Sequence, residues 1–399
     1  MRKFLIVILC FFACSCASKS DILIKEEKNY DISYNSNNFN VYSKVQLKDI
    51  IDDENIELLN GDDYVDTDTL GEKKFTLKYL HDGKKYKKVL NYTITDNDKP
   101  ILINVPSTQT VTLNSEVNPC DKAVFADNYD KKPTCNIEGE YDTKQVGTYN
   151  LTYIIRDSSN NTVSKKLTFN VIIPSNNTTT TKKPTTTDTK RKKISEAIEQ
   201  YKNDNTMIGI DVSRYQENID FEKVKNSGVE FVMIRIGVQS GAKKDVSIDS
   251  YYLENIKKAK EAGLLVGVYL YSTAISPEIA KEQAKWVIKT LDGVKLDFPI
   301  AFDWENWQYF REYEISLYDL SKSYLSFAKE IEKNGYKAML YGSKYYLENM
   351  WLDKGNYPVW LAHYTDKTNY SGDHIMWQYS AIGEVDGINS AVDLDVYYK

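Results

Sequence analysis

The chain contains the stretch Phe298-Pro-Ile-Ala-Phe-Asp-Trp-Glu-Asn306, in which a short apolar run leads directly into two acids. An apolar run of this length, bounded by a proline and a polar turn, predicts a buried parallel strand. Residues two apart on a strand face the same side, so Asp303 and Glu305 should project together from its carboxyl end. Two carboxyl groups held close together cannot ionise independently, and the one with the raised pKa can donate a proton near neutral pH. A solvated strand end is the competing interpretation of an isolated D-x-E.

The sequence around this stretch has the pattern of a parallel β/α fold. From Met207 onward, apolar runs alternate with amphipathic helical stretches, at 249–262, 277–291, 316–334 and 344–350. Eight strands are predicted, at 208–211, 231–237, 265–271, 300–304, 338–341, 359–362, 375–378 and 392–396. Eight strands in about 190 residues indicate a compact, irregular α/β (TIM-like) barrel, in which the carboxyl ends of the strands form the active-site rim.

Acidic residues gather at this predicted rim. Asp211 ends the first strand, the D-x-E acids end the fourth, and Asp393 lies on the last. Four acids from three strands are unexpected in a purely structural barrel, and they predict general acid/base catalysis. The rim also offers residues for substrate contacts, namely Tyr269, Tyr271, Tyr341, Trp360, Gln378 and Asp395. Ordinary barrel packing is the competing interpretation for each of these aromatic residues.

Other kinds of chemistry have little support in the sequence. The net charge of −6 argues against a nucleic-acid partner. The three histidines, His81, His363 and His374, are scattered and lack the H-x-x-x-H spacing of a metal site, so neither a metal nor another cofactor is expected. A G-x-S-x-G nucleophile motif is also missing from the sequence.

Four segments carry a resemblance to a known family. They are Gly209-Ile-Asp-Val-Ser-Arg-Tyr-Gln216, Asp303-Trp-Glu305, Trp377-Gln-Tyr379 and Val392-Asp-Leu-Asp395. In this order, across residues 207–399, they resemble the glycoside hydrolase family 25 lysozymes, the Chalaropsis-type muramidases. The resemblance implies an irregular α/β barrel that cleaves the β-1,4 bond between N-acetylmuramic acid and N-acetylglucosamine in peptidoglycan. Glycan strands of the cell wall would then be the partner.

The resemblance also implies roles for the four acids. Glu305 matches the general acid, Asp303 its partner carboxylate, Asp211 the first-strand acid and Asp393 the last-strand acid. We expect an ionised Asp303 to hold the proton of Glu305 to higher pH. A carboxylate nucleophile would sit roughly 5–5.5 Å from the acid, and inversion through water needs roughly 6.5–9.5 Å. The resemblance favours a third route, in which the substrate's own N-acetyl oxygen attacks and Asp303 orients the amide.

Two positions depart from the family pattern. Tyr-Leu-Tyr at 269–271 stands where many members have a histidine after the first tyrosine, and this difference affects substrate contacts. Asp395 stands where many members have asparagine. The extra carboxylate either raises the pKa of a neighbouring acid or is solvated and inert.

Two alternative functions belong to different classes. One is a chitinase-like hydrolase of 2-acetamido sugars, although the longer D-x-x-D-x-D-x-E pattern of chitinases is missing from the sequence. The other is a non-catalytic lipoprotein that binds the cell wall or mediates adhesion. Release of reducing sugar from walls distinguishes the second alternative from an enzyme, and comparison of chitin with peptidoglycan distinguishes the first.

The N-terminus has the features of an export signal. A basic Met1-Arg-Lys precedes a ten-residue apolar run and small residues, which predicts a signal peptide at 1–16. Ala13-Cys14-Ser15-Cys16 resembles a bacterial lipoprotein box, so Cys16 is the expected lipidation site and Cys14 a second candidate. The predicted location is the outer face of the cell membrane through a lipid anchor, with secretion to the cell wall as the alternative.

Two β domains and a linker are predicted before the barrel. Asp66-Thr-Asp-Thr-Leu-Gly71 recurs 76 residues later as Asp142-Thr-Lys-Gln-Val-Gly147, and alternating segments follow both copies. This predicts β-sandwiches at 17–96 and 97–173, and Asp98-Lys-Pro-Ile-Leu102 resembles the opening of bacterial immunoglobulin-like domains. We expect them to act as spacers, with cell-wall adhesion as the alternative. Cys120 and Cys135 are a candidate disulfide, 174–205 a Thr/Lys/Pro-rich linker and 206–399 the catalytic barrel.

Overall fold

The computed structural model describes residues 25–26, 30–174, 191–242 and 245–399 and divides into two compact units, Met1–Asn97 and Asp98–Lys399. The predicted signal peptide with Cys16, and most of the predicted linker, lie outside the described residues. Among the residues that are described, no helix is both long and apolar enough to cross a membrane.

The first unit is built around one long hairpin. Strands β4 (Gly71–His81) and β5 (Lys84–Thr95) pair antiparallel, and β1 (Lys25–Glu26), β2 (Asn38–Asn40) and β3 (Ile56–Leu58) extend their sheet. A short helix, α1 (Leu47–Ile50), precedes β3. Leu77 and Tyr79 on β4 are buried, while Thr76 and Lys78, which alternate with them, are exposed. This period of two is the alternation that the sequence predicts.

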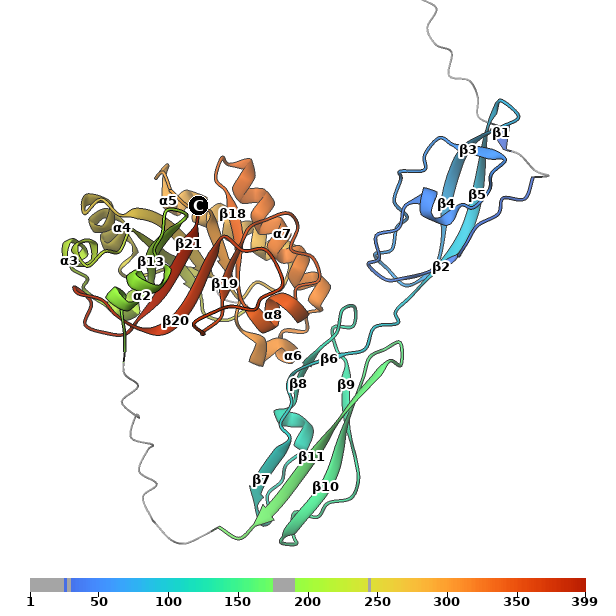
Figure 1. Ribbon diagram of the computed structural model, residues 1–399. Coiled ribbons are helices and arrows are strands. Elements are labelled where there is room, and N and C mark those ends of the chain that lie inside the picture. The colour runs from blue at the N-terminus through green and yellow to red at the C-terminus, as the bar shows by residue number, and fades with distance from the viewer. Residues whose placement is uncertain (1–24, 27–29, 175–190, 243–244) are drawn as a thin grey trace, which may run out of the picture. The chain divides into compact units, whose positions relative to one another are not determined.

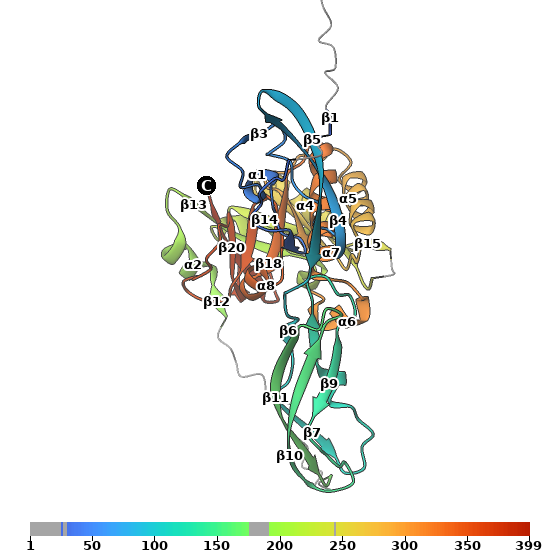
Figure 2. The same cartoon turned by 90° about the vertical axis from the view of Figure 1, so that its right-hand side faces the viewer.

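The second β domain has a similar hairpin, of β10 (Gly147–Arg156) and β11 (Thr162–Ile172) (Figures 1 and 2). With β7 (Thr108–Thr112) and β9 (Thr134–Glu138) they form a four-stranded sheet, and β6 (Ile101–Asn104) pairs with β8 (Val124–Ala126). Cys120 lies in the 3₁₀ helix η1 (Pro119–Lys122) and forms a disulfide with Cys135 on β9. Both hairpins begin at the glycine of the repeated motif, Gly71 and Gly147. The immunoglobulin-like assignment stays a prediction.

The C-terminal part of the second unit contains a closed barrel of eight strands. Seven of them run parallel, β13 (Thr206–Val212), β14 (Phe231–Gln239), β16 (Leu265–Tyr271), β17 (Ile300–Asp303), β18 (Ala338–Ser343), β19 (Val359–Ala362) and β20 (Met376–Glu384). The eighth, β21 (Val392–Tyr398), pairs with both β13 and β20 and closes the ring. The predicted eight strands are therefore confirmed.

The direction of the last strand differs from the parallel pattern that we expected. Strand β21 is antiparallel to both of its neighbours. The connection 385–391 between β20 and β21 is too short for the crossover helix that a parallel strand needs, whereas an antiparallel strand can follow a short loop. This direction decides which residues of β21 reach the rim.

Helices pack around the barrel. Four of them lie where the sequence predicts helical stretches, α4 (Tyr252–Glu261), α5 (Pro277–Leu291), α7 (Leu317–Lys333) and α8 (Lys344–Asn349). The short helix α3 (Phe221–Asn226), between β13 and β14, was not predicted. Helix α5 begins at a Ser276 cap followed by proline at its first position, and α7 begins at a capping box formed by Ser316 and Asp319. Both helices pack against each other and bury one apolar face.

The predicted linker is shorter in the structure than the range 174–205. Residues Lys192–Lys193 form strand β12, which pairs with β20, and Ile194–Tyr201 form helix α2. Ile194 and Ala197 belong to the barrel core, and the Tyr201 ring contacts the rings of Trp377 and Tyr379. The predicted linker range therefore extends too far toward the barrel, because the apolar residues of 194–201 recur at helical spacing.

The second β domain contacts the barrel within the second unit. Nη1 of Arg311, on helix α6 (Phe310–Tyr313), donates hydrogen bonds to the carbonyl oxygens of Cys120 and Ala123, each at 2.8 Å. The backbone nitrogen of Leu317 donates to the carbonyl oxygen of Asp127 at 2.9 Å. Ala126 is part of the barrel core. The β domain thereby holds the segment that follows Glu305.

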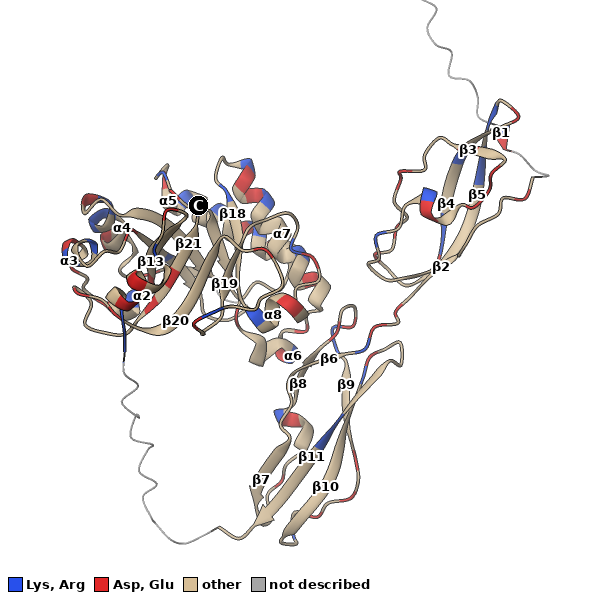
Figure 3. Cartoon of the chain, in the orientation of Figure 1, with Lys and Arg blue, Asp and Glu red and all other residues tan. Residues whose placement is uncertain are grey.

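Charges of both signs lie on the outer surface of the barrel. Figure 3 shows them side by side on α8, where Lys344 Nζ lies 2.6 Å from Glu348 Oε2. Pairs of this kind on exposed helices contribute little to stability. Acidic side chains gather instead inside the barrel mouth.

Candidate active site

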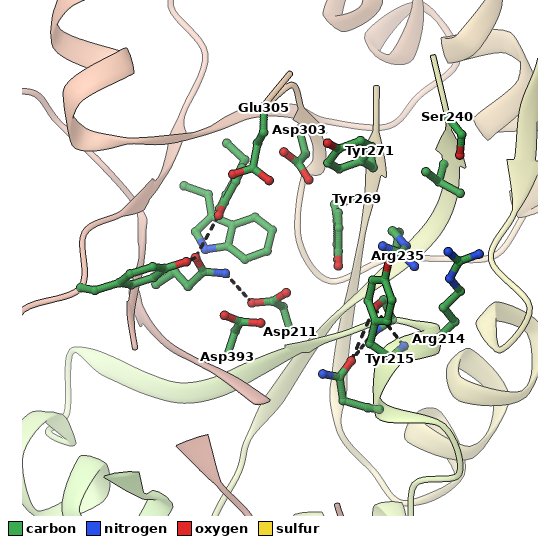
Figure 4. Close-up of a pocket in the computed structure, with 17 residues that line it drawn as sticks. Asp211, Arg214, Tyr215, Arg235, Ser240, Tyr269, Tyr271, Asp303, Glu305 and Asp393 are labelled. Carbon is green, nitrogen blue, oxygen red and sulfur yellow. Dashed lines mark hydrogen bonds between the residues drawn. The ribbon is translucent and has the colours of Figure 1, made fainter. Parts of the chain in front are cut away.

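A cavity of about 440 Å³ opens at the carboxyl ends of the parallel strands. All four predicted acids, Asp211, Asp303, Glu305 and Asp393, line it (Figure 4). Asp303 ends β17, and Glu305 follows two residues later. Because β21 is antiparallel, its first residues lie at the same end as the last residues of β13, and Asp393 pairs in register with Asp211. The predicted gathering of acids therefore occurs, although one member arrives on a strand of opposite direction.

The carboxyl group of Glu305 has a raised pKa. Desolvation by the surrounding cleft, together with the negative charge of Asp393, raises its pKa to about 7 although part of the side chain is exposed. Burial and the neighbouring Glu305 also raise the pKa of Asp303, while Arg235 opposes the increase. The sequence predicted that an ionised Asp303 would hold the proton of Glu305. In the structure the charge that raises the pKa of Glu305 is on Asp393.

A hydrogen-bond network holds Asp211. Gln378 Nε2 donates to Asp211 Oδ2 at 2.7 Å, and Gln378 Oε1 accepts from the hydroxyls of Tyr341 at 2.9 Å and Tyr364 at 3.1 Å. Both hydrogen-bonding ends of the Gln378 amide are used, which fixes its orientation. Burial, reinforced by the charges of Asp393 and Asp395, raises the pKa of Asp211.

Asp395 does not line the cavity, which corrects its expected role in substrate binding. Its side chain is fully buried, and its Oδ1 accepts a hydrogen bond of 2.8 Å from Trp360 Nε1. A hydrogen bond to the Asp211 carboxyl group raises the pKa of Asp211, and burial raises that of Asp395. On an antiparallel strand, the step from Asp393 to Asp395 leads away from the rim and deeper into the barrel. Asp395 therefore raises the pKa of its neighbour Asp211, which is one of the two outcomes expected for the extra carboxylate.

The predicted aromatic residues all line the cavity, but most are buried. Trp360 is only 1% exposed and contacts Tyr341 and Tyr269 edge to face. Tyr271 is partly exposed, and its hydroxyl donates to Asn306 Oδ1 at 3.1 Å. Packing therefore accounts for much of Trp360, Tyr341 and Tyr269, whereas Tyr271 presents surface to a ligand.

Residues that the sequence analysis missed also line the cavity. Tyr215 and Tyr364 are 65% and 59% exposed. Tyr215 lies inside a segment that carried the family resemblance, and Tyr364 follows two residues after the predicted strand 359–362, so their positions in the sequence already pointed to them. Arg214 and Arg235 also line the cavity, on the side away from Glu305 (Figure 4). The two arginines come together at the Tyr215 ring only through tertiary contacts, which a local sequence pattern does not predict.

Comparison with known proteins places the barrel in a family. The family model for glycosyl hydrolases family 25 matches residues 210–388, a range that includes Asp211, Asp303 and Glu305. The uncharacterized protein YegX of Escherichia coli strain K12 is 34% identical over 200 residues, which cover 48% of this chain and 70% of YegX. The autolytic lysozyme of Clostridium acetobutylicum is 31% identical over 193 residues, which cover 48% of this chain and 56% of that lysozyme.

Among solved structures, the spore cortex lytic enzyme SleM of Clostridium perfringens is similar to half of the chain. It is 23% identical with a TM-score of 0.43, over 50% of this chain and 69% of SleM. The family match covers residues 210–388 with three of the four acids, and the match to YegX extends over 70% of that protein. The chain belongs to glycosyl hydrolase family 25 and is a glycosidase.

Proposed function

We propose that the chain is an N-acetylmuramidase that hydrolyses the β-1,4 bond between N-acetylmuramic acid and N-acetylglucosamine in peptidoglycan. The observation that carries this proposal is Glu305, a carboxyl group with a pKa of about 7 in a cavity lined by three further acids. Glycosidic cleavage needs such a protonated acid near neutral pH. Membership of family 25 and the similarity to an autolytic lysozyme favour peptidoglycan as the substrate.

In the first step Glu305 acts as the general acid. Its proton passes to the glycosidic oxygen while the bond from this oxygen to the anomeric carbon breaks. A group that is protonated below about pH 7 can transfer a proton and take it back within one catalytic cycle. In the second step the Glu305 carboxylate removes a proton from water.

Asp303 is suited to hold the substrate's acetamido group. Its Oδ1 atom is buried and has no hydrogen-bond partner among the described residues, although the side chain lines the cavity. A buried acceptor without a donor is costly unless a ligand supplies one, and the N–H of an acetamido group is such a donor. Held in this way, the acetamido oxygen attacks the anomeric carbon and forms a cyclic intermediate. Water then opens the ring, which retains the configuration.

Asp211 and Asp393 act around this pair. Asp393 maintains the raised pKa of Glu305 by its charge. Asp211 is fixed by Gln378 and buried, so it presents a carboxyl group of constant position to the sugar ring. Hydrogen bonds between this carboxyl group and the sugar strengthen as charge develops on the sugar, and they thereby lower the barrier to cleavage.

The test is the substitution Glu305→Gln, assayed by release of reducing ends from purified cell walls. We expect a loss of at least about a thousandfold in kcat with retained folding, because the amide cannot donate the proton. Glu312→Gln, at an exposed position on α6, is the matched control and should retain activity. Mass spectrometry of the products identifies the bond, since the proposal requires N-acetylmuramic acid at the new reducing end. Full activity of Glu305→Gln would refute the proposal.

We further propose that the enzyme works outside the cytoplasm and is tethered through a lipid on Cys16. The basic start, the apolar run and the small residues around Cys16 support this location. Replacement of Cys16 by Ser should move the protein from the membrane fraction to the soluble fraction. Unchanged partitioning would favour secretion instead.

A further inference from the structure

We propose that Arg214, which lies against the ring of Tyr215, forms a subsite for a carboxylate on the substituent that the muramyl sugar carries at its O3 position. The inference rests on the proposed muramidase function and adds a determinant of substrate choice. A muramyl residue differs from N-acetylglucosamine by this lactyl substituent, whose carboxylate is free or extended by a peptide with further carboxylates. A cation in the cavity would therefore favour peptidoglycan over a neutral chitin strand.

The position of Arg214 is fixed by the strands that carry the acids. The 3₁₀ helix η2 (Arg214–Gln216) follows β13 directly and begins at a Ser213 cap. The Gln216 side chain accepts a hydrogen bond from Ser213 N at 2.9 Å and donates one to the carbonyl oxygen of Ala391 at 3.1 Å. Helix η2 is thus attached both to the end of the Asp211 strand and to the residue before the Asp393 strand. Arg214 therefore keeps a constant place relative to the acids.

The Tyr215 ring orders the two guanidinium groups. The Arg214 and Arg235 guanidinium carbons lie 5.2 Å and 5.1 Å from the centre of this ring. Contacts of this length between a cation and an aromatic face are attractive. Hydrogen bonds to Arg214 and the charges of both arginines lower the pKa of Tyr215. A cation already ordered in this way loses less entropy when it binds an anion.

The charges of this corner do not cancel. Arg235 is buried and forms an ion pair with Asp249, with Nη2 and Nε lying 2.7 Å and 2.8 Å from Oδ2. The backbone nitrogen of Arg214 also donates to Asp249 Oδ2, at 3.1 Å. Among the described residues, no carboxylate lies within ion-pair distance of the Arg214 guanidinium group. Two arginines against one aspartate leave one positive charge, on the exposed Arg214.

The positive charge of Arg214 lies in a cavity that also contains four acids. The acids on the opposite side repel an anionic substrate, so a carboxylate near the cleavage point needs a local counter-charge. A planar guanidinium binds a carboxylate through two parallel hydrogen bonds. Arg235 is already engaged with Asp249, and its charge also lowers the pKa of Asp303. Arg214 is therefore the arginine that remains for the substrate.

The test compares a glycan with its neutral form. Peptide-free peptidoglycan glycan of defined length carries free lactyl carboxylates, and coupling to ammonia converts them to amides. Binding of both forms is measured by calorimetry on Glu305→Gln, which cannot turn them over, with and without Arg214→Gln. Arg214→Lys keeps the charge, and Lys257→Gln removes an exposed charge on α4 as the matched control.

We expect Arg214→Gln to weaken binding of the acidic glycan about tenfold and to leave binding of the amidated glycan within about twofold. Arg214→Lys should recover part of the loss, and Lys257→Gln should change neither affinity. Higher salt should reduce the preference for the acidic form only when Arg214 is present. Equal effects of Arg214→Gln on both glycans, or no effect on either, would overturn the subsite. Neither result would affect the proposed function, which fails only if Glu305→Gln still hydrolyses cell walls.

Discussion

Asp211 and Asp393 lie opposite each other as register partners on β13 and β21, two strands that run in opposite directions. This pairing is what brings the acid of the first strand and the acid of the last strand to one rim. Had β21 been parallel, the residues at its C-terminal end would lie at this rim in place of Asp393. The proximity also explains why the charge of Asp393 contributes to the raised pKa of Asp211.

Activity should fall as the pH rises through neutrality. The pKa of Glu305 is raised from its ordinary value to about 7, so the proton that it donates is present below this pH and lost above it. We expect kcat/KM on soluble glycan to decrease about tenfold per pH unit above roughly 8. A rate that stays constant up to pH 9 would contradict Glu305 as the donor.

Asp393→Asn should shift this alkaline limb to lower pH. The negative charge of Asp393 disfavours ionisation of Glu305, so its removal lowers the pKa of Glu305. We expect a shift of roughly one unit, together with a lower rate at pH 7. The pH profile of kcat/KM for the variant measures the shift. A limb that does not move would exclude an electrostatic role for Asp393.

Asp395→Asn should stabilise the protein at alkaline pH. Burial raises the pKa of Asp395, so its carboxyl group costs the folded state increasingly more stability as the pH rises above the ordinary pKa of an aspartate toward its folded pKa. Asparagine can still accept the hydrogen bond from Trp360 Nε1. Urea unfolding should therefore show a gain of about 1 kcal/mol at pH 8 and little change at pH 4. A loss of stability that is equal at pH 4 and pH 8 would contradict this expectation and would indicate a purely steric role for Asp395.

Gln378→Leu should impair both folding and catalysis. The change leaves Asp211 Oδ2 and the two tyrosine hydroxyls without the amide that joins them. We expect a loss of about 1–3 kcal/mol in stability and a decrease in kcat larger than any change in KM. Thermal unfolding and steady-state kinetics measure the two effects. An active variant of normal stability would show that the network is dispensable.

Arg311→Met should weaken the attachment of the second β domain to the barrel. The change removes two hydrogen bonds to backbone carbonyl oxygens and the contact of the guanidinium with the Phe125 ring, 4.8 Å away. We expect a loss of about 1–3 kcal/mol in the full chain, measured by urea unfolding. Lys131→Gln, which breaks an exposed pair with Asp319, serves as the control and should cost less than about 1 kcal/mol.

The sequence predicted the parts of the fold that depend on local pattern. Apolar runs marked all eight barrel strands, and the acids at their ends marked the cavity. The direction of β21 was not predicted because it depends on how a short connection closes the ring. The burial of Asp395 follows from that direction. The arrangement of Arg214 and Arg235 depends on Asp249, which is distant from Arg214 in the sequence.

The closing strand β21 also affects the pKa of Glu305. Asp393 lies on β21, and its charge contributes to the raised pKa of Glu305, which follows β17. While β21 is unpaired the sheet is open, and Glu305 lacks both this charge and part of the burial that raises its pKa. The raised pKa of Glu305 is therefore a property of the completed ring and not of the segment that carries the residue.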